Sequence, residues 1–389
     1  MPWPLDRLAA PTGLPLEGVK VLDLSRVLAG PFATQLLGDL GADVIKVEQR
    51  GSGDPIRQLG PPFVGETASY YLATNRNRRS VVANLDQAED FGIVAELAAS
   101  ADIIVENFLP HQAKELGIDG LRASLPEAVW ISVRPASSKG PLGGLPAFDL
   151  LAQARSGIMG VTGEDGGEPL RVGTPISDVL TGLYAATAAL AGLHRRTLEG
   201  RGTQVEVPLL ESMVTGLVNQ AQGFLVTGVN PVAMGNHHPS ITPYGPVDCA
   251  DGLLMLAVGT ESQYRSLVRL LDDPRLTNNP RFVDFATRSK HREELLMILA
   301  EHFTMKSRVE WIDLLGMAKI PAAPINSVEQ ALTDPQILAA ELLLDAHYDG
   351  APVRLVGSPL LVDGLNLPLR RDPPILGADD LDIRSEMNS

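Results

Sequence analysis

One carboxylate in this sequence lies where a helix is predicted to begin. Asp178 is part of the segment GTPISDVLTGLYAA, and the Ala- and Leu-rich residues 179–196 that follow are typical of a long helix. An aspartate in the first turn of a helix often only caps it, because its charge complements the free N–H groups there. A carboxylate can also act as a nucleophile in covalent catalysis, so Asp178 is a candidate for both roles.

Two further segments carry groups suited to ligand binding. Arg76, Arg78 and Arg79 fall within four positions and lead into a predicted strand. Guanidinium groups bind phosphates through paired hydrogen bonds, so this run is either a phosphate clamp or a solvated group of charges. Phe108 follows the apolar residues 103–105 and either stacks on a purine ring or packs in the core.

The overall composition argues against several classes of protein. Acidic residues outnumber basic ones 47 to 32, and the resulting charge of −15 repels nucleic acid. The single cysteine, Cys249, cannot form an internal disulfide, which fits a reducing compartment. No stretch with the pattern of a signal peptide or a membrane span stands out, so we expect a cytoplasmic protein that binds no membrane. No H-E-x-x-H motif or pair of cysteine ligands indicates a metal site.

Alternating strand and helix patterns predict an α/β fold. Strands are expected at residues 19–24, 44–47, 81–85, 103–105, 129–133 and 203–207. Helices are expected at residues 33–40, 88–99, 179–196 and 209–227. This order implies a Rossmann-like domain with a mostly parallel sheet and helices on both faces, and ligands bind such sheets at the carboxyl ends of the strands. Arg26, Glu48 and Asn107 each follow a predicted strand and are therefore expected to line a cleft.

A proline- and glycine-rich segment at residues 229–246 indicates a linker or an active-site loop. We therefore predict a large domain over residues 1–224, a smaller α+β domain over 225–330, and a return to the large domain over 331–389. The smaller domain is expected to contain a strand at residues 253–258, followed by helices at 262–271, 292–303 and 308–316.

The order and spacing of several short motifs resemble class III coenzyme A (CoA) transferases, a family that includes formyl-CoA transferase, carnitine CoA-transferase and α-methylacyl-CoA racemase. The resemblance extends from about residue 15 to about residue 380. Besides Asp178, the matching segments are AGPFATQLLGDLGADVIKVE at 29–48, NRNRRS at 75–80, VENF at 105–108, DLLAQ at 149–153, HPSITPYG at 238–245 and TDPQ at 333–336.

The resemblance implies that Asp178 is a nucleophile. Its carboxylate would attack the thioester of an acyl-CoA donor, form a mixed anhydride and then an aspartyl-CoA thioester, and pass CoA to an acceptor acid. A free aspartate has a pKa of about 3.9, so we expect Asp178 to be ionised at neutral pH without a general base. CoA and acyl-CoA are substrates in this scheme, and no tightly bound cofactor is implied.

The resemblance also implies binding residues. The expected CoA contacts are Arg26, Val27, Leu28, Gln49, Arg50, Arg76, Arg78, Arg79, Asn107, Phe108 and Lys114. A loop over residues 234–244 is expected to close over the intermediate, and its candidate contacts are Gly235, Asn236, His237, His238 and Tyr244. Many relatives carry a basic residue where Glu115 stands here, so the phosphate partner in that region is open.

Two other functions are weighed against CoA transfer. Racemase members move a proton with a histidine whose place is taken here by Phe148, and a phenyl ring cannot carry a proton. A non-catalytic acyl-CoA-binding protein is the second alternative. The HPSITPYG segment is most similar to members that use dicarboxylic acids, so succinyl-CoA and a dicarboxylic acid are the expected substrates. Family members form interlocked homodimers, and we expect the same here.

Overall fold

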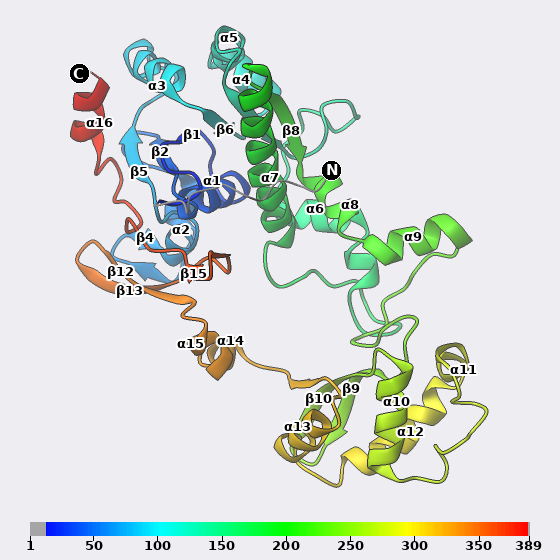
Figure 1. The fold of residues 1–389 in the computed structure, drawn as a ribbon. Coiled ribbons are helices and arrows are strands. Elements are labelled where there is room, and N and C mark those ends of the chain that lie inside the picture. The colour runs from blue at the N-terminus through cyan, green and yellow to red at the C-terminus, as the bar shows by residue number, and fades with distance from the viewer. Residues whose placement is uncertain (1–12, 388–389) are drawn as a thin grey trace, which may run out of the picture. The chain divides into compact units, whose positions relative to one another are not determined.

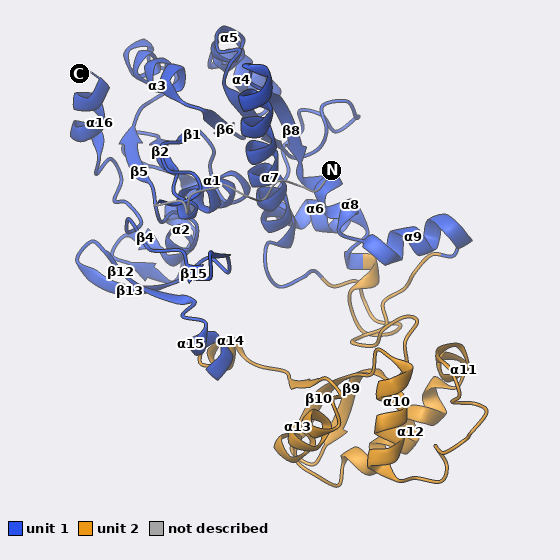
Figure 2. Cartoon of the chain, in the orientation of Figure 1, with its two compact units in different colours: residues 1–159, 171–229, 335–389 blue, residues 160–170, 230–334 orange. Residues whose placement is uncertain are grey.

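The computed structural model describes residues 13–387, and the chain forms two compact units (Figure 2). The larger unit comprises the chain up to residue 159, residues 171–229, and the chain from residue 335 onward. The smaller unit comprises residues 160–170 and 230–334. The sequence analysis expected boundaries near residues 225 and 330 and did not separate residues 160–170 from the large domain.

A parallel six-stranded sheet forms the centre of the larger unit (Figure 1). In spatial order its strands are β5 (Arg79–Val82), β2 (Asp43–Glu48), β1 (Lys20–Asp23), β6 (Ile103–Glu106), β7 (Val129–Arg134) and β8 (Gln204–Pro208). The chain first runs outward from β1 to β5 and then continues on the other side of β1 with β6. Loops after β1 and β6 therefore diverge and leave a crevice at the carboxyl ends of these strands. The predicted parallel α/β fold is confirmed.

Helices pack on both faces of this sheet. On one face, α1 (Ala29–Asp39) and α7 (Ile176–Glu199) bury small and branched side chains against β1, β6 and β7. The opposite face packs against α3 (Ala88–Ser100), α5 (Ile118–Ser124) and α16 (Asp380–Met387). The other helices of the unit are α2 (Ser69–Ala73), α4 (Pro110–Glu115), α6 (Asp149–Ser156), α8 (Leu209–Thr215), α9 (Val218–Thr227) and α15 (Pro335–Ala339), with the 3-10 turn η1 (Pro55–Gln58). A second 3-10 turn, η2 (Met159–Val161), begins at the last residue before the smaller unit.

Three short antiparallel hairpins complete the larger unit. They are β3 (Phe63–Val64) with β4 (Thr67–Ala68), β12 (Leu343–Tyr348) with β13 (Ala351–Val356), and β14 (Leu361–Val362) with β15 (Leu365–Asn366). The residues after 335 thus pack with the larger unit, and a buried hydrogen bond from Arg57 to the Tyr348 hydroxyl at 3.0 Å links them to it.

Helix α7 alone in the described chain is long and apolar enough to cross a membrane, a feature that the sequence analysis overlooked. Its buried residues are mostly small, among them Gly182, Ala185 and Ala189, and they pack on α1 and the sheet. A Cβ atom at Gly182 would lie 2.8 Å from the Ala29 carbonyl oxygen. This close approach packs one face of α7 against the larger unit and brings its N-terminal turns beside the start of α1.

The predicted helix at residues 209–227 is wrong as a single element. It is divided into α8 and α9 at Gly216 and Leu217, and Val218 adopts a positive φ of 42°. An α-helix cannot continue through a residue with positive φ, because its carbonyl then points away from the helix axis. Hydrophobic periodicity alone did not reveal this break.

The smaller unit contains a three-stranded antiparallel sheet with helices packed against it. The sheet order is β11 (Ala322–Pro324), β10 (Gly252–Ala257) and β9 (Tyr244–Cys249). The helices that pack against it are α10 (Glu261–Leu271), α12 (Arg292–Phe303) and α13 (Arg308–Met317). Two short helices, α11 (Phe285–Lys290) and α14 (Val328–Leu332), add no side chain to this core. Cys249 is buried in the core of this unit as a free thiol.

Candidate active site

Asp178 lies in the first turn of α7 and lines a cleft at the carboxyl ends of the sheet strands. The cleft, which we call the Asp178 cleft, has a volume of about 350 Å³. Its lining includes Arg26, Val27, Leu28, Ala29, Pro55, Asn107, Phe108, Gln112, Arg134, Pro135, Phe148, Asp178 and Leu209. The expected nucleophile and five expected CoA contacts (residues 26–28, 107 and 108) therefore lie around one cavity of the larger unit.

The environment of Asp178 corrects an expectation about its charge. The carboxyl group is half-buried, and among the described residues it has no hydrogen-bond donor. Loss of hydration and, secondarily, the negative charge of Asp149 raise the pKa of Asp178 to about 7. The group is thus only partly ionised at neutral pH, and the helix N-terminus does not keep its pKa at the ordinary value.

Asp149 is a second carboxylate at a helix N-terminus, and its contacts differ. Its Oδ1 accepts hydrogen bonds from the Ser177 backbone N–H at 2.9 Å and from the Ser177 hydroxyl. Its Oδ2 accepts one from Gln153 Nε2 at 2.7 Å, and Gln153 Oε1 accepts the Val172 N–H at 2.9 Å. Asp149, the first residue of α6, thereby fixes the position of Ser177, which precedes Asp178 in α7.

Tyr70 of α2 lies in the electrostatic field of both carboxylates. Burial, followed by the charges of Asp178 and Asp149, raises the pKa of Tyr70 to about 12. Its hydroxyl therefore keeps its proton across the neutral range. No motif in the sequence singled out Tyr70, because it is 108 residues before Asp178 and only the fold brings it close.

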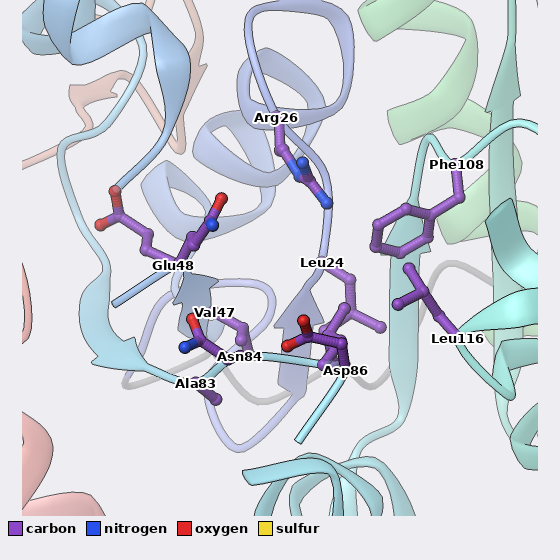
Figure 3. Close-up of a pocket in the computed structure, with 11 residues that line it drawn as sticks. Leu24, Arg26, Val47, Glu48, Ala83, Asn84, Asp86, Phe108 and Leu116 are labelled. Carbon is purple, nitrogen blue, oxygen red and sulfur yellow. The ribbon is translucent and has the colours of Figure 1, made fainter. Parts of the chain in front are cut away.

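A second pocket adjoins the Asp178 cleft, with a volume of about 190 Å³ (Figure 3). We call it the Asn84 pocket, and it is lined by Leu24, Arg26, Val47, Glu48, Gln49, Ala83, Asn84, Leu85, Asp86, Phe108 and Leu116. Arg26 and Phe108 line both cavities, with the guanidinium carbon 5.2 Å from the ring centroid. Asn107 fixes this junction, since it accepts the Arg26 N–H at 3.0 Å and donates to the Arg26 carbonyl at 2.8 Å.

The arginine run has a different environment from the one expected. Arg76 donates to Asp39, and its Nη2 lies 2.5 Å from Oδ2. Arg78 pairs with Asp23 at 2.8 Å, and Arg79 pairs with Asp43 and Glu386. All three arginines are buried, so carboxylates within the fold already neutralise them. This finding argues against the phosphate clamp, because releasing a buried guanidinium would leave a carboxylate unpaired.

The remaining expected CoA contacts divide between the pocket and the surface. Gln49 lines the Asn84 pocket. Arg50 is directed to Asp90 instead, with its Nη2 3.1 Å from Oδ1. Lys114 and its neighbour Glu115 are exposed on α4, and neither lines either cavity. Arg26 is therefore the expected cation that lines both cavities, and within residues 13–387 it forms no salt bridge to a carboxylate.

The expected loop contacts lie in the smaller unit. His238 Nδ1 accepts the backbone N–H groups of Ser240 and Ile241, each at 3.1 Å, and its ring lies 5.3 Å from that of Tyr244. His237 is half-buried, and burial together with Arg292 lowers the pKa of its imidazole. His238 thus organises its own loop, and His237 favours the neutral form. Closure of the segment that contains Gly235 and Asn236 stays a prediction.

Several lining residues escaped the sequence analysis. Pro55, Gln112, Arg134, Pro135 and Leu209 line the Asp178 cleft, and Asn84 lines the adjoining pocket. Pro135 and Leu209 directly follow a strand, Arg134 is the last residue of β7, and Asn84 lies two residues after β5. The rule that ligands bind at strand ends would therefore have been a usable signal for Arg134 and Asn84. Phe148, which replaces the racemase histidine, lines the same cleft as Asp178 and is 70% exposed.

Within residues 13–387, no group of three or more His, Cys, Asp or Glu side chains is arranged to hold a metal ion. The cleft combines one weakly solvated carboxyl group with two arginines and two phenyl rings, Phe108 and Phe148. Of the arginines, Arg134 is paired with Glu106, and Arg26 is the cation left for a ligand. Such a set of groups suits nucleophilic attack on a carbonyl and binding of an anionic, partly aromatic ligand.

Comparison with known proteins places this arrangement in a family. Residues 16–380 match CoA-transferase family III, and the chain belongs to that family of enzymes, which transfer CoA. It is 36% identical over 376 residues to human succinyl-CoA:glutarate CoA-transferase, covering 96% of this chain and 86% of the relative. It is also 36% identical over 384 residues to the succinate–glutarate CoA-transferase of Agrobacterium fabrum, covering 96% of each.

A solved structure shows the same fold. The crystal structure of a CAIB/BAIF family protein from Brucella suis is similar to this chain with a TM-score of 0.85 and 35% sequence identity. The similarity covers 96% of this chain and 99% of that one. The resemblance inferred from short motifs is thereby confirmed over nearly the whole chain, including the parallel sheet that carries the Asp178 cleft.

Proposed function

We propose that this enzyme moves CoA from succinyl-CoA, or a similar acyl-CoA, to a dicarboxylic acid through covalent intermediates on Asp178. The observation that carries the proposal is a half-buried carboxyl group with no hydrogen-bond donor in a cleft shared with Arg26 and Phe108. A carboxylate that is poorly solvated and unengaged is more reactive towards a carbonyl than one surrounded by donors.

The proposed chemistry exchanges bonds without a net proton transfer. The Asp178 carboxylate attacks the donor thioester, and the tetrahedral intermediate expels CoA thiolate, which leaves a mixed anhydride of Asp178 and the donor acid. The thiolate then attacks the aspartyl carbonyl, which forms the Asp178–CoA thioester and releases the donor acid. The acceptor carboxylate attacks this thioester and expels CoA thiolate, which gives a second anhydride between Asp178 and the acceptor. The thiolate then attacks the acceptor carbonyl of this anhydride, which forms the product acyl-CoA and regenerates the Asp178 carboxylate.

Backbone N–H groups at the start of α1 are suited to stabilise the oxyanions of these steps. Leu28 and Ala29 line the Asp178 cleft, and their N–H groups make no hydrogen bond within the described chain. Donors of this kind are effective when they are fixed before the reaction and do not have to reorganise. We assign to them the tetrahedral intermediates that form at the thioester and anhydride carbonyls.

The two adjoining cavities suggest how CoA lies. Its nucleotide end would occupy the Asn84 pocket, with the base against Phe108, and its thioester end would reach Asp178 past Arg26. Arg26→Ala should raise the KM for succinyl-CoA about tenfold with a smaller change in kcat, because a charge-assisted contact to a bound anion is lost. Arg76→Ala is the matched control, and it should lower stability rather than weaken CoA binding. Equal KM values for the two variants would contradict this assignment.

The proposal for a dicarboxylic substrate rests on the relatives. Human and Agrobacterium relatives are named for succinate and glutarate. The decisive experiment incubates the enzyme with succinyl-CoA and a panel of mono- and dicarboxylic acids and measures each new thioester by mass spectrometry. Transfer to dicarboxylic acids should predominate. A preference for monocarboxylic acceptors would reject this part of the proposal.

Trapping tests the covalent mechanism. Hydroxylamine added during turnover should modify Asp178, because it attacks the anhydride and the aspartyl thioester. Peptide mass spectrometry identifies the modified residue, and a modification elsewhere would exclude Asp178 as the nucleophile. Asp178→Ala should bind succinyl-CoA and show no modification.

Racemisation is the second candidate reaction, and Phe148 bears on it. Its ring lines the cleft at the position where the racemase histidine falls, so the site lacks that proton carrier. We therefore expect no incorporation of deuterium at the α-carbon of a 2-methylacyl-CoA in D2O. Incorporation at a rate comparable to CoA transfer would favour racemase activity. A protein that binds acyl-CoA but transfers nothing to any acid in the panel would support the non-catalytic alternative.

Three further features belong to the proposal. We propose an interlocked homodimer in the cytoplasm, and closure of the loop with Gly235, Asn236, His237, His238 and Tyr244 over the intermediate. Closure would exclude water, which otherwise hydrolyses the anhydride. Light scattering at several protein concentrations tests the dimer, and a monomer throughout would reject it. Deletion of residues 235–238 should increase hydrolysis of succinyl-CoA relative to transfer.

A further inference from the structure

Val27 adopts a backbone conformation that is rare for its residue type. Its φ is 69°, in the left-handed region, which a β-branched side chain seldom occupies. The residue lies between the end of β1 and the start of α1, and it lines the Asp178 cleft. A conformation of this kind persists only where surrounding contacts determine it, and such positions cluster at functional sites.

Two buried charged residues supply those contacts. Both carboxylate oxygens of Asp54 accept the Val27 N–H, at 3.0 and 3.2 Å. Lys46 Nζ lies 2.9 Å from Asp54 Oδ2 and donates to the Ser25 carbonyl at 2.8 Å. The Lys46 and Asp54 side chains are fully buried. Lys46 on β2 thus holds the loop after β1 from two directions, directly at Ser25 and through Asp54 at Val27.

We propose that Lys46 and Asp54 are positioning residues of the CoA-transfer site, which act through Val27 and touch no substrate. Neither residue lines the Asp178 cleft. They fix Val27 in the left-handed conformation, and this in turn directs Leu28 and Ala29 at the start of α1 toward the cleft. The catalytic consequence rests on the proposed function, in which these two residues stabilise the oxyanions.

A merely structural ion pair is the competing interpretation. Burying two ions costs free energy that their attraction often fails to recover, so stability alone is a weak reason for such a pair. The hydrogen bond from the Val27 N–H to Asp54 instead suggests a local role for the pair, because it holds one residue in a rare backbone conformation. Glycine adopts positive φ without steric cost, so a glycine at position 27 depends less on Asp54 to hold its conformation.

The experiment measures the effect of Asp54→Ala in two backgrounds, Val27 and Val27→Gly. With valine at position 27, Asp54→Ala should lower kcat for CoA transfer at least tenfold while KM for succinyl-CoA changes less. With glycine at position 27, the same substitution should lower kcat less than threefold relative to Val27→Gly itself. Equal losses in the two backgrounds would overturn the proposal, as would full activity of Asp54→Ala.

Two controls separate positioning from a general loss of stability. Asp363 also has a positive φ, 52°, in the exposed turn between β14 and β15. Asp363→Gly should leave the tenfold effect of Asp54→Ala intact. Should Asp54→Ala not fold, Lys46→Met with Asp54→Leu removes both ions without leaving one unpaired. The loss of kcat caused by this double substitution is then compared between the Val27 and Val27→Gly backgrounds, and equal losses would again overturn the proposal.

Amide hydrogen exchange provides a readout that is independent of turnover. Loss of Asp54 should accelerate exchange in the peptide that spans residues 24–32 and leave peptides of the smaller unit unchanged. Unchanged exchange in that peptide would show that Asp54 does not hold Val27, even if activity falls. If the unmodified enzyme transfers CoA to no acid, the proposed function fails, whereas the exchange experiment still tests the contact between Asp54 and Val27.

Discussion

The N-terminal turns of α6 and α7 each carry an aspartate, and the two carboxylates have opposite surroundings. Asp149 in α6 accepts hydrogen bonds from Ser177 and Gln153 and joins two helices. Asp178 in α7 has no donor among the described residues, and burial with the neighbouring Asp149 raises its pKa to about 7. Both aspartates lie in the first turn of their helix. The difference teaches that a saturated carboxylate is structural, whereas an unsatisfied one close to it is available for chemistry.

Removal of the unsatisfied carboxylate should have the largest effect on activity. Asp178→Ala is expected to reduce CoA transfer by about 10³-fold or more, because no other group in the Asp178 cleft can form the acyl intermediate. Steady-state assays with succinyl-CoA measure the loss, and titration calorimetry measures whether the thioester still binds. Activity within tenfold of the unmodified enzyme would remove Asp178 from the mechanism.

Removal of the saturated carboxylate should affect stability first. Asp149→Ala leaves the Ser177 N–H without an acceptor, and an unsatisfied buried group costs about 1–3 kcal/mol. The Ser177 hydroxyl and the Gln153 amide keep only their weaker bonds to the carbonyls of residue 149, at 3.1 Å, and Thr174, at 3.3 Å. We expect a lower free energy of unfolding and roughly tenfold lower kcat, because the first turn of α7 loses its anchor. Urea denaturation tests this expectation. A variant as stable as the unmodified protein would show that Asp149 does not hold α7.

The pH dependence of kcat/KM tests how the two carboxylates interact. Only ionised Asp178 is a nucleophile, so activity should rise with pH and level off above a pKa of about 7. Asp149→Asn keeps the shape of the side chain and removes its charge. The apparent pKa of the activity should therefore fall, as Asp149 raises the pKa of Asp178. A profile that does not move in the variant would eliminate this charge interaction.

The same pKa predicts a stability effect of opposite sign to that of an ion-paired aspartate. The carboxyl pKa of Asp178 is raised on folding, so the folded protein holds this proton more tightly and loses stability as pH rises from about 4 to 7. Asp178→Asn does not ionise. Its melting temperature should therefore exceed that of the unmodified protein at pH 8, and the gap should narrow toward pH 4. A gap that is constant with pH would contradict the raised pKa.

The smallest effect is expected at Ser177. Ser177→Ala removes the hydroxyl donor to Asp149 but keeps the backbone N–H donor at 2.9 Å, so about 1 kcal/mol of stability should be lost. The kcat should fall less than threefold. Thermal unfolding and steady-state kinetics on one preparation measure both quantities. If Ser177→Ala lowered kcat more than Asp149→Ala does, the Ser177 hydroxyl rather than the Asp149 carboxylate would be the main anchor of the first turn of α7.

The sequence predicted the elements around the cleft better than their chemistry. Arg26 and Asn107 follow strands β1 and β6, and the predicted ends of these strands lie within a residue of the observed ones. Buried strands are predicted this well because they leave a clear apolar pattern. The division between α8 and α9 at Gly216 was missed, since both helices continue one apolar periodicity. Charge partners leave no such pattern, and this explains why Arg76, Arg78 and Arg79 were read as free cations.

The sequence by itself determined the fold class and the family and singled out Asp178 as the candidate nucleophile, because strand and helix periodicities and motif spacing are local properties of the chain. The tertiary structure decided which charged groups are free. Asp23, Asp39 and Asp43 neutralise the arginine run across neighbouring strands and helices, and Asp149 and Tyr70 meet Asp178 from elements distant in sequence. The pKa of a carboxylate depends on burial and on charges nearby in space, and neither is a property of local sequence.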